Sequence, residues 1–251
     1  VTISANIKDN NFDPTVGLAL HEGSHIKLTN FDLLKNLSGR IKDIDDNFFK
    51  INDDTIYKIC EDVKSLLNYV EDRRIDYFIY TNAPGYKPYY RAMYDTYFHS
   101  KAIDKGLKST EYRTEDMESY MFRIINITNS NRDLDALKGL RDIWLLLDLG
   151  NISRLENTTD ALKVAMDIYK VIAYNIQTEK TSDEKNEESK DESSEGNESN
   201  EGNNSDDGTT AEGEDSNDTT PGDFDLNERE KKQFDNAVEK QKDFMDGNVK
   251  K

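Results

Sequence analysis

Cysteine is almost missing from this chain, which has Cys60 as its only thiol in 251 residues. One cysteine cannot form a disulfide within the chain, and it cannot build a cysteine-based zinc cluster. We therefore expect a reducing compartment, the cytoplasm. Cys60 falls among apolar residues at helical spacing, so we expect its thiol to be buried and unreactive.

Long apolar runs and an excess of positive charge are also lacking. No run approaches the roughly 20 apolar residues that cross a bilayer, and no secretory leader is visible at the start. Lys and Arg number 33 against 51 Asp and Glu, a net charge of −18. Phosphate backbones and anionic lipid surfaces attract clustered cations, so we expect neither nucleic acid nor membrane as a partner.

Apolar residues disappear between Thr178 and Gly222, where Glu, Asp, Ser, Asn and Gly dominate. Such a segment cannot bury enough apolar surface to offset its chain entropy, so it is expected to be a disordered acidic linker. The chain then divides into a helical domain over 1–177, the linker over 178–222, and a charged helix over 223–251. Because neither end has a clear boundary signal, we expect a fragment whose last helix leads into a further domain beyond Lys251.

Elsewhere the apolar residues recur at helical spacing, and no series of alternating strands or internal repeat is visible. The sequence therefore predicts a mainly α fold. Asp13 and Pro14 suit the N-cap and first position of a helix that runs to Leu28, after a weak strand or irregular arm over 1–11. The other expected helices cover 31–37, 53–79, 86–98, 114–127, 133–149 and 160–177, with a turn at 82–85 and a stop at Ser38-Gly39.

One motif points to chemistry: His21-Glu22-Gly23-Ser24-His25. On a helix, residues i and i+4 lie on one face, so both imidazoles can bind one metal ion. Glu22 is offset by about 100° and can take a proton from a water that the metal activates. Gly17, one turn earlier, allows another element to approach the helix closely.

A catalytic zinc site needs a third protein ligand and leaves a fourth position for water. The acidic run Glu71-Asp72-Arg73-Arg74-Ile75-Asp76 offers candidates. On a helical wheel Glu71 lies at the edge of the apolar stripe, whereas Asp72 and Asp76 point towards solvent. A carboxylate on a buried face is costly unless a cation binds it, so we favour Glu71 as the third ligand.

Other assignments stay open. Arg74, three residues after Glu71, can instead form an ion pair with it. Asp76 or His99 can supply the third ligand, and Asp72 or Asp76 can orient a ligand histidine through its second nitrogen.

A cluster of tyrosines follows this helix. Tyr86, Tyr89 or Tyr90 can fold back to stabilise a developing oxyanion, although aromatic residues at helical spacing more often belong to a core.

Three segments together carry a resemblance: Ala19 to Ile26, Glu71 to Asp76, and Pro84-Gly85-Tyr86. They resemble the metallopeptidase-like region that precedes a von Willebrand A domain in the cobaltochelatase-subunit and nitric-oxide-reductase-activation families, including phage forms. The resemblance implies a helical zincin-like fold and an AAA+ ring ATPase as partner. It also implies zinc held by His21, His25 and Glu71, with Glu22 as general base.

Two functions follow, and we favour the first. The chain is expected to be a zinc metallopeptidase that cleaves a peptide or protein substrate. The alternative is a non-catalytic, zinc-stapled interaction module that works with a von Willebrand A domain and a ring ATPase. A metal-free helical adaptor, in which the motif is accidental, is the third possibility.

Overall fold

The computed structural model describes residues 9–188 and 220–247, and every regular element in these ranges is a helix. The expected mainly α fold is confirmed. The helices are α1 (Asp9–Leu28), α2 (Phe31–Lys35), α3 (Leu37–Ile44), α4 (Ile56–Asn82), α5 (Lys87–Tyr97), α6 (Lys101–Lys108), α7 (Met117–Ile125), α8 (Leu140–Leu146), α9 (Leu149–Ile152), α10 (Thr158–Glu188) and α11 (Glu228–Met245), with 3₁₀ turns η1 (Phe48–Lys50) and η2 (Pro84–Tyr86).

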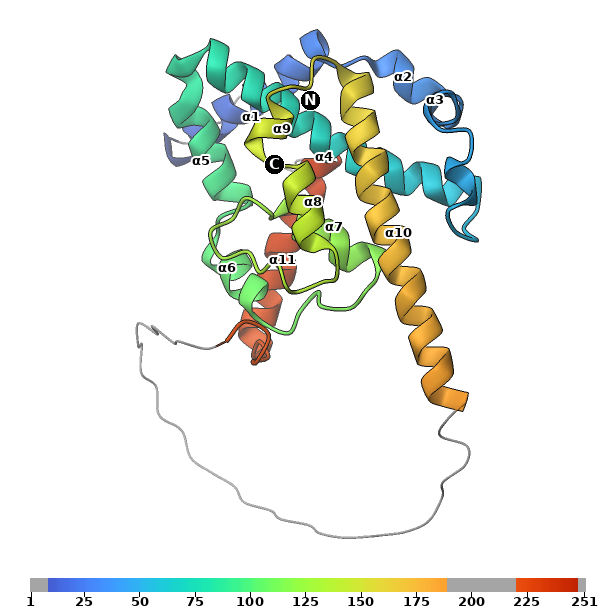
Figure 1. Cartoon of the computed structure of the whole chain (residues 1–251). Helices are drawn as coiled ribbons and strands as arrows, with labels where there is room; N and C mark the ends of the chain where they lie inside the picture. The colour runs from blue at the N-terminus through green and yellow to red at the C-terminus, as the bar shows by residue number, and fades with distance from the viewer. Residues whose placement is uncertain (1–8, 189–219, 248–251) are drawn as a thin grey trace, which may run out of the picture.

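Helix α4 runs through the middle of the body (Figure 1). It begins at the N-cap Thr55, whose side chain accepts a hydrogen bond from the backbone N–H of Lys58. It packs against α10 and α1, and more briefly against α3, α7 and α9. Because neighbours surround it, α4 buries charged as well as apolar side chains, and its buried surface is wider than a single stripe.

The α1–α5 pair is held close by a glycine. A Cβ atom placed on Gly17 would lie 2.4 Å from the backbone oxygen of Tyr89 and 2.9 Å from Cβ of Met93. No side chain larger than hydrogen fits there. The expected close approach at Gly17 is confirmed, and α5 is the element that approaches.

Several helix boundaries differ from expectation. Helix α1 begins at Asp9, so Pro14 lies inside it, in its second turn, and Asp13 is not its N-cap. Gly39 does not stop a helix but lies within α3. The helix expected over 133–149 is reduced to α8, because Gly139 adopts a left-handed φ of 72° immediately before it. Helix α6 was not expected.

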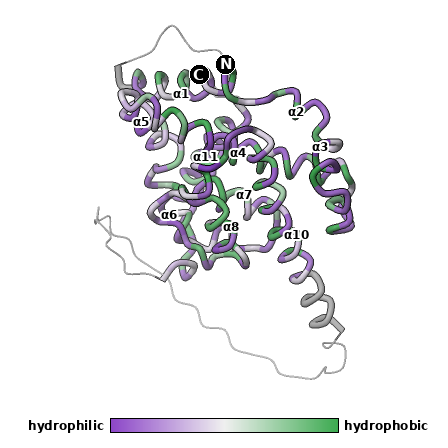
Figure 2. Tube along the Cα trace, turned by 45° about the horizontal axis from the view of Figure 1, so that its top comes forward, coloured by the Kyte–Doolittle hydropathy of each residue, from purple (hydrophilic) through white to green (hydrophobic). Residues whose placement is uncertain are grey.

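The last helix is part of the body. Helix α11 packs on α6 and α5, and its buried side chains include Phe234, Val238 and Phe244. Figure 2 shows hydrophobic and hydrophilic stretches following one another along the helices of the body. The ring of Phe234 occupies the space that a Cβ on Gly106 would fill, at 2.1 Å.

The acidic linker expected over 178–222 lies mostly outside the described residues, which omit 189–219. Helix α10 continues past its expected end at Gln177 to Glu188. The first eight residues, which include most of the expected N-terminal arm, and the last four also lie outside the description. Among the described helices, none is both long and apolar enough to cross a membrane.

Candidate metal centre

Two pairs of side chains face each other across the contact between α1 and α4. His21 and His25 are one turn apart on α1, and Asp72 and Asp76 are one turn apart on α4. His21 is 3 % exposed, Asp72 5 % and Asp76 7 %, while His25 is partly buried. The same i, i+4 spacing on both helices brings the four polar groups to one place.

The carboxylate nearest to both imidazoles belongs to Asp72. Its Oδ1 atom lies 3.0 Å from Nε2 of His25 and 3.6 Å from Nε2 of His21. The two imidazole rings meet edge to face with centroids 5.0 Å apart. The potential ligand atoms of these three residues all lie within 4.8 Å of one another, which is close enough to share one metal ion.

The other nitrogen of each imidazole is already engaged. Nδ1 of His21 lies 2.9 Å from Oδ1 of Asp76, and Nδ1 of His25 lies 2.9 Å from the hydroxyl oxygen of Thr29. The hydroxyl of Tyr94 on α5 donates a hydrogen bond to the other carboxylate oxygen of Asp76. These contacts orient both rings so that the Nε2 atoms are directed at Asp72, as in metal sites whose histidines are held from behind.

One buried polar atom in this group lacks a hydrogen bond. Oδ1 of Asp72 is buried and accepts no hydrogen bond from any described residue, although two imidazole nitrogens are near. A buried carboxylate oxygen without a hydrogen bond is costly. A cation shared with the two Nε2 atoms would remove that cost, so the residues present fit a metal ion.

Protonation of His21 offers a second way to balance the charge. Burial by itself lowers the pKa of His21, but the nearby carboxylates of Asp76 and Asp72 outweigh it and raise the pKa to about 9. A cationic imidazole between two carboxylates is an ion-pair network. The same residues are therefore arranged for a proton or for a metal ion, and the two compete for His21.

Glu71, the expected third ligand, lies elsewhere. Arg74 binds its carboxylate with two hydrogen bonds of 2.8 and 2.7 Å, and the Thr158 hydroxyl donates a third of 2.9 Å. Arg74 also reaches the backbone oxygen of Leu28. The ion pair that the sequence left as an alternative is thus formed. Asp72, one residue on, faces the histidines in place of Glu71.

The expectation that Asp72 and Asp76 point towards solvent is wrong, because α1 packs on that side of α4 and Tyr94 of α5 contacts Asp76 there. The weighed alternative in which Asp76 contacts a histidine from behind does agree with the observed geometry. Glu22 is half-buried on α1 beside His21, and its charge contributes to the raised pKa of that histidine.

Of the remaining candidates, Tyr90 lies beside the centre, where it interacts with Asp76 and Ser24. Tyr86 is exposed in η2, and Tyr90 is buried. His99 pairs with Asp95 at 3.0 Å near the protein surface. Cys60 is half-buried, and burial raises the pKa of its thiol.

Sequence reasoning missed Tyr94. The available signal was its position four residues after Tyr90, which places the two tyrosines on one face of a helix.

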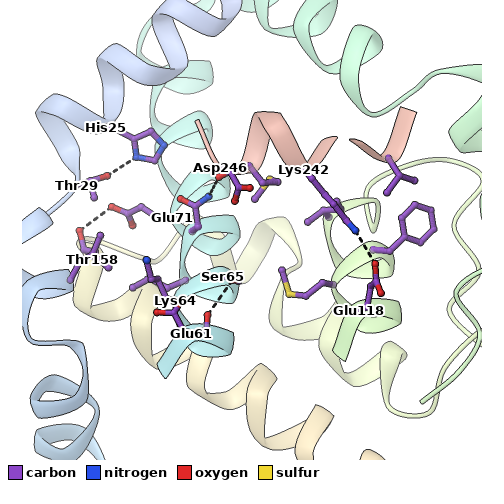
Figure 3. A pocket seen from close by; sticks show the side chains of 18 of the residues that line it. His25, Thr29, Glu61, Lys64, Ser65, Glu71, Glu118, Thr158, Lys242 and Asp246 are labelled. Carbon is purple, nitrogen blue, oxygen red and sulfur yellow. Dashed lines mark hydrogen bonds and ion pairs between the residues drawn. The ribbon is translucent and has the colours of Figure 1, made fainter. Parts of the chain in front are cut away.

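A pocket of about 570 Å³ opens beside His25 (Figure 3). Its walls come from α1, α2, α4, α7, α11 and the start of α10, so segments from most of the chain contribute. Figure 3 shows the hydrogen bond between His25 and Thr29 at one end and the pair of Lys242 and Glu118 at the other. The candidate metal centre therefore has a cavity at its less buried side.

No protein-family model, no curated protein and no solved structure matches this chain. The resemblance to the metallopeptidase-like regions that precede von Willebrand A domains accordingly rests on the His21 to His25 motif, the Glu71 to Asp76 segment and the Pro84 turn.

Proposed function

We propose that this chain is a zinc-dependent, metallopeptidase-like domain in which His21, His25 and Asp72 hold the metal. One observation carries the proposal: the buried Oδ1 of Asp72, which lacks a hydrogen bond, lies between the two Nε2 atoms. Two imidazole nitrogens and one carboxylate oxygen are a ligand set that catalytic zinc uses, with the fourth position left for water.

The neighbouring residues suit this role. Asp76 fixes the orientation of His21, Tyr94 fixes Asp76, and Thr29 fixes His25. Partners of this kind tune metal affinity, and their loss commonly lowers it 10- to 100-fold. The single cysteine of the chain is consistent with a cytoplasmic protein.

Zinc, when bound, would lower the pKa of a water molecule and polarise a substrate carbonyl. The chain's own contribution is the movement of a proton. The carboxylate of Glu22 follows His21 directly on α1 and is half-buried. It would accept the proton of the attacking water and pass it to the amine that leaves the cleaved peptide bond.

The alternative function is a zinc-stapled interaction module. The three proposed ligands come from two helices, so a metal ion would also fasten α1 to α4. By the resemblance, such a module would work with a von Willebrand A domain and a ring ATPase of the AAA+ type.

Elemental mass spectrometry of the purified chain tests the metal, and peptide hydrolysis tests the chemistry. We expect about one zinc per chain, lost in His21→Ala and kept in His99→Ala, which removes the histidine outside the centre. Glu22→Gln is expected to keep zinc and to lose hydrolysis of a mixed peptide library.

The outcomes separate the two functions. Hydrolysis that survives Glu22→Gln, or a zinc-loaded wild-type chain without any hydrolysis, would favour the interaction module. A chain that takes up no zinc from zinc-replete buffer would refute both.

A further inference from the structure

The pocket beside His25 has a mixed lining in which apolar surface predominates. Its apolar lining includes Leu67 from α4, Met121 and Ile125 from α7, and Val238 and Met245 from α11. Its volume of about 570 Å³ falls within the range of about 300–1,000 Å³ that is typical of ligand pockets. It is larger than a single side chain requires.

The pocket meets the candidate metal centre on one side only. The side chain of His25 is 14 % exposed, against 3 % for that of His21, and His25 is the metal-centre residue that lines the cavity. A molecule that reaches the centre from this cavity therefore approaches past His25.

Four acids and two lysines also line the pocket, namely Glu61, Glu71, Glu118, Asp246, Lys64 and Lys242. Lys242 on α11 binds Glu118 on α7 at 2.8 Å, so this cation is already neutralised. Glu71 is engaged by Arg74 and Thr158. The excess of acids disfavours an anionic group, whereas the methionines of the lining, which are flexible and polarisable, can adapt to apolar side chains of different shape.

We propose that this pocket binds bulky apolar side chains of an extended peptide next to the bond to be cleaved. The inference rests on the proposed function, because it takes the metal centre as the place of cleavage. Burial of one leucine side chain contributes about 1.5–3 kcal/mol, which corresponds to a roughly 10- to 100-fold preference over glycine. Since α11 supplies one wall, the segment after residue 219 takes part in selecting the substrate.

Two hydroxamates, which bind zinc through the same group, separate the pocket from the metal. The whole zinc-loaded chain is titrated by calorimetry with N-acetyl-glycine hydroxamate and with N-acetyl-leucine hydroxamate, which differ only in the side chain. We expect the leucine compound to bind about 10- to 100-fold more tightly. Equal affinity on a chain with bound zinc would overturn the pocket and leave the metal centre intact. A chain without zinc would overturn the proposed function and this inference together.

Matched variants locate the preference. Met121 lines the pocket, while Met117, one turn earlier on α7, is equally half-buried and lines a different cavity. Met121→Gln is expected to reduce the preference for the leucine compound at least threefold, and Met117→Gln to leave it unchanged, with zinc content equal in both. Met245→Gln on α11 provides a second test if Met121→Gln fails to fold. An unchanged preference in every folded pocket variant would overturn the inference.

Discussion

Asp72 and Glu71 are neighbours in sequence with opposite surroundings. Glu71 has an arginine and a hydroxyl as partners, so its charge is balanced within the protein. Oδ1 of Asp72 is buried, accepts no hydrogen bond from the described residues, and lies beside the Nε2 atoms of two imidazoles. Because the only ion-pair partners of Asp72 in the described part of the chain are imidazoles that can themselves bind a metal, Asp72 is the better candidate for a metal ligand than Glu71, whose charge Arg74 already balances.

Exchange of each acid for alanine distinguishes the two roles. Asp72→Ala is expected to lose zinc, because it removes a ligand. Glu71→Ala is expected to keep zinc but to lower the free energy of unfolding by about 3 kcal/mol, since Arg74 stays buried without its partner. Zinc content and urea denaturation measure the two effects. Zinc lost from Glu71→Ala and retained by Asp72→Ala would restore Glu71 as the ligand.

At the scale of elements, the metal centre depends on how closely α1 lies to α5 and α4. Gly17 permits the contact with α5, one turn before His21. That contact also places Tyr94 against Asp76, so the packing of α5 holds the outer part of the site. A substitution that changes the spacing of these helices should therefore shift His21 from its position, although His21 itself is not replaced.

The two glycines of α1 offer a controlled test of this dependence. Gly17→Ala is expected to destabilise the chain by about 1–3 kcal/mol through overpacking against the α5 backbone, and to weaken zinc binding. A Cβ on Gly23 would meet nothing within 4 Å. Gly23→Ala is therefore expected to be neutral or to stabilise by up to about 1 kcal/mol, because alanine favours helices. Thermal unfolding measures both, and equal effects of the two variants would contradict the close-packing argument.

At the scale of the whole molecule, the last helix, α11, contacts helix α1, which lies more than 200 residues earlier in the chain. The ring of Phe244 lies 5.3 Å from that of His21 and also contacts Tyr97 and Phe98. The amide of Gln241 exchanges two hydrogen bonds with that of Asn126, both fully buried. Helix α11 therefore packs on the helical domain itself, and its Phe244 lies against His21 of the candidate site.

The buried amide pair tests how firmly α11 is attached. Gln241→Leu leaves Asn126 without its partner and is expected to cost about 1–3 kcal/mol. Gln233→Leu changes an exposed glutamine of the same helix, and its effect is expected to stay within about 0.5 kcal/mol. The double variant Asn126→Leu with Gln241→Leu should recover part of the loss. Urea denaturation measures all three, and a negligible effect of Gln241→Leu would mean that α11 is only loosely docked.

The sequence by itself determined the features that depend on local order. Helical spacing of apolar residues gave the mainly α fold, and the i, i+4 spacing placed His21 and His25 together. Gly17 indicated a close neighbour before that neighbour was known, and the apolar positions of the last helix predicted α11. Each of these follows from residues within a few turns of one another.

The tertiary structure decided which carboxylate faces the histidines. A helical wheel divides α4 into one apolar and one polar side, but α4 is surrounded, so Asp72 and Asp76 are buried on the side expected to be polar. The contact of Tyr94 with Asp76, and the wall that α11 gives to the pocket, join segments far apart in sequence. Such contacts depend on which helices meet, and helix periodicity carries no information about that choice.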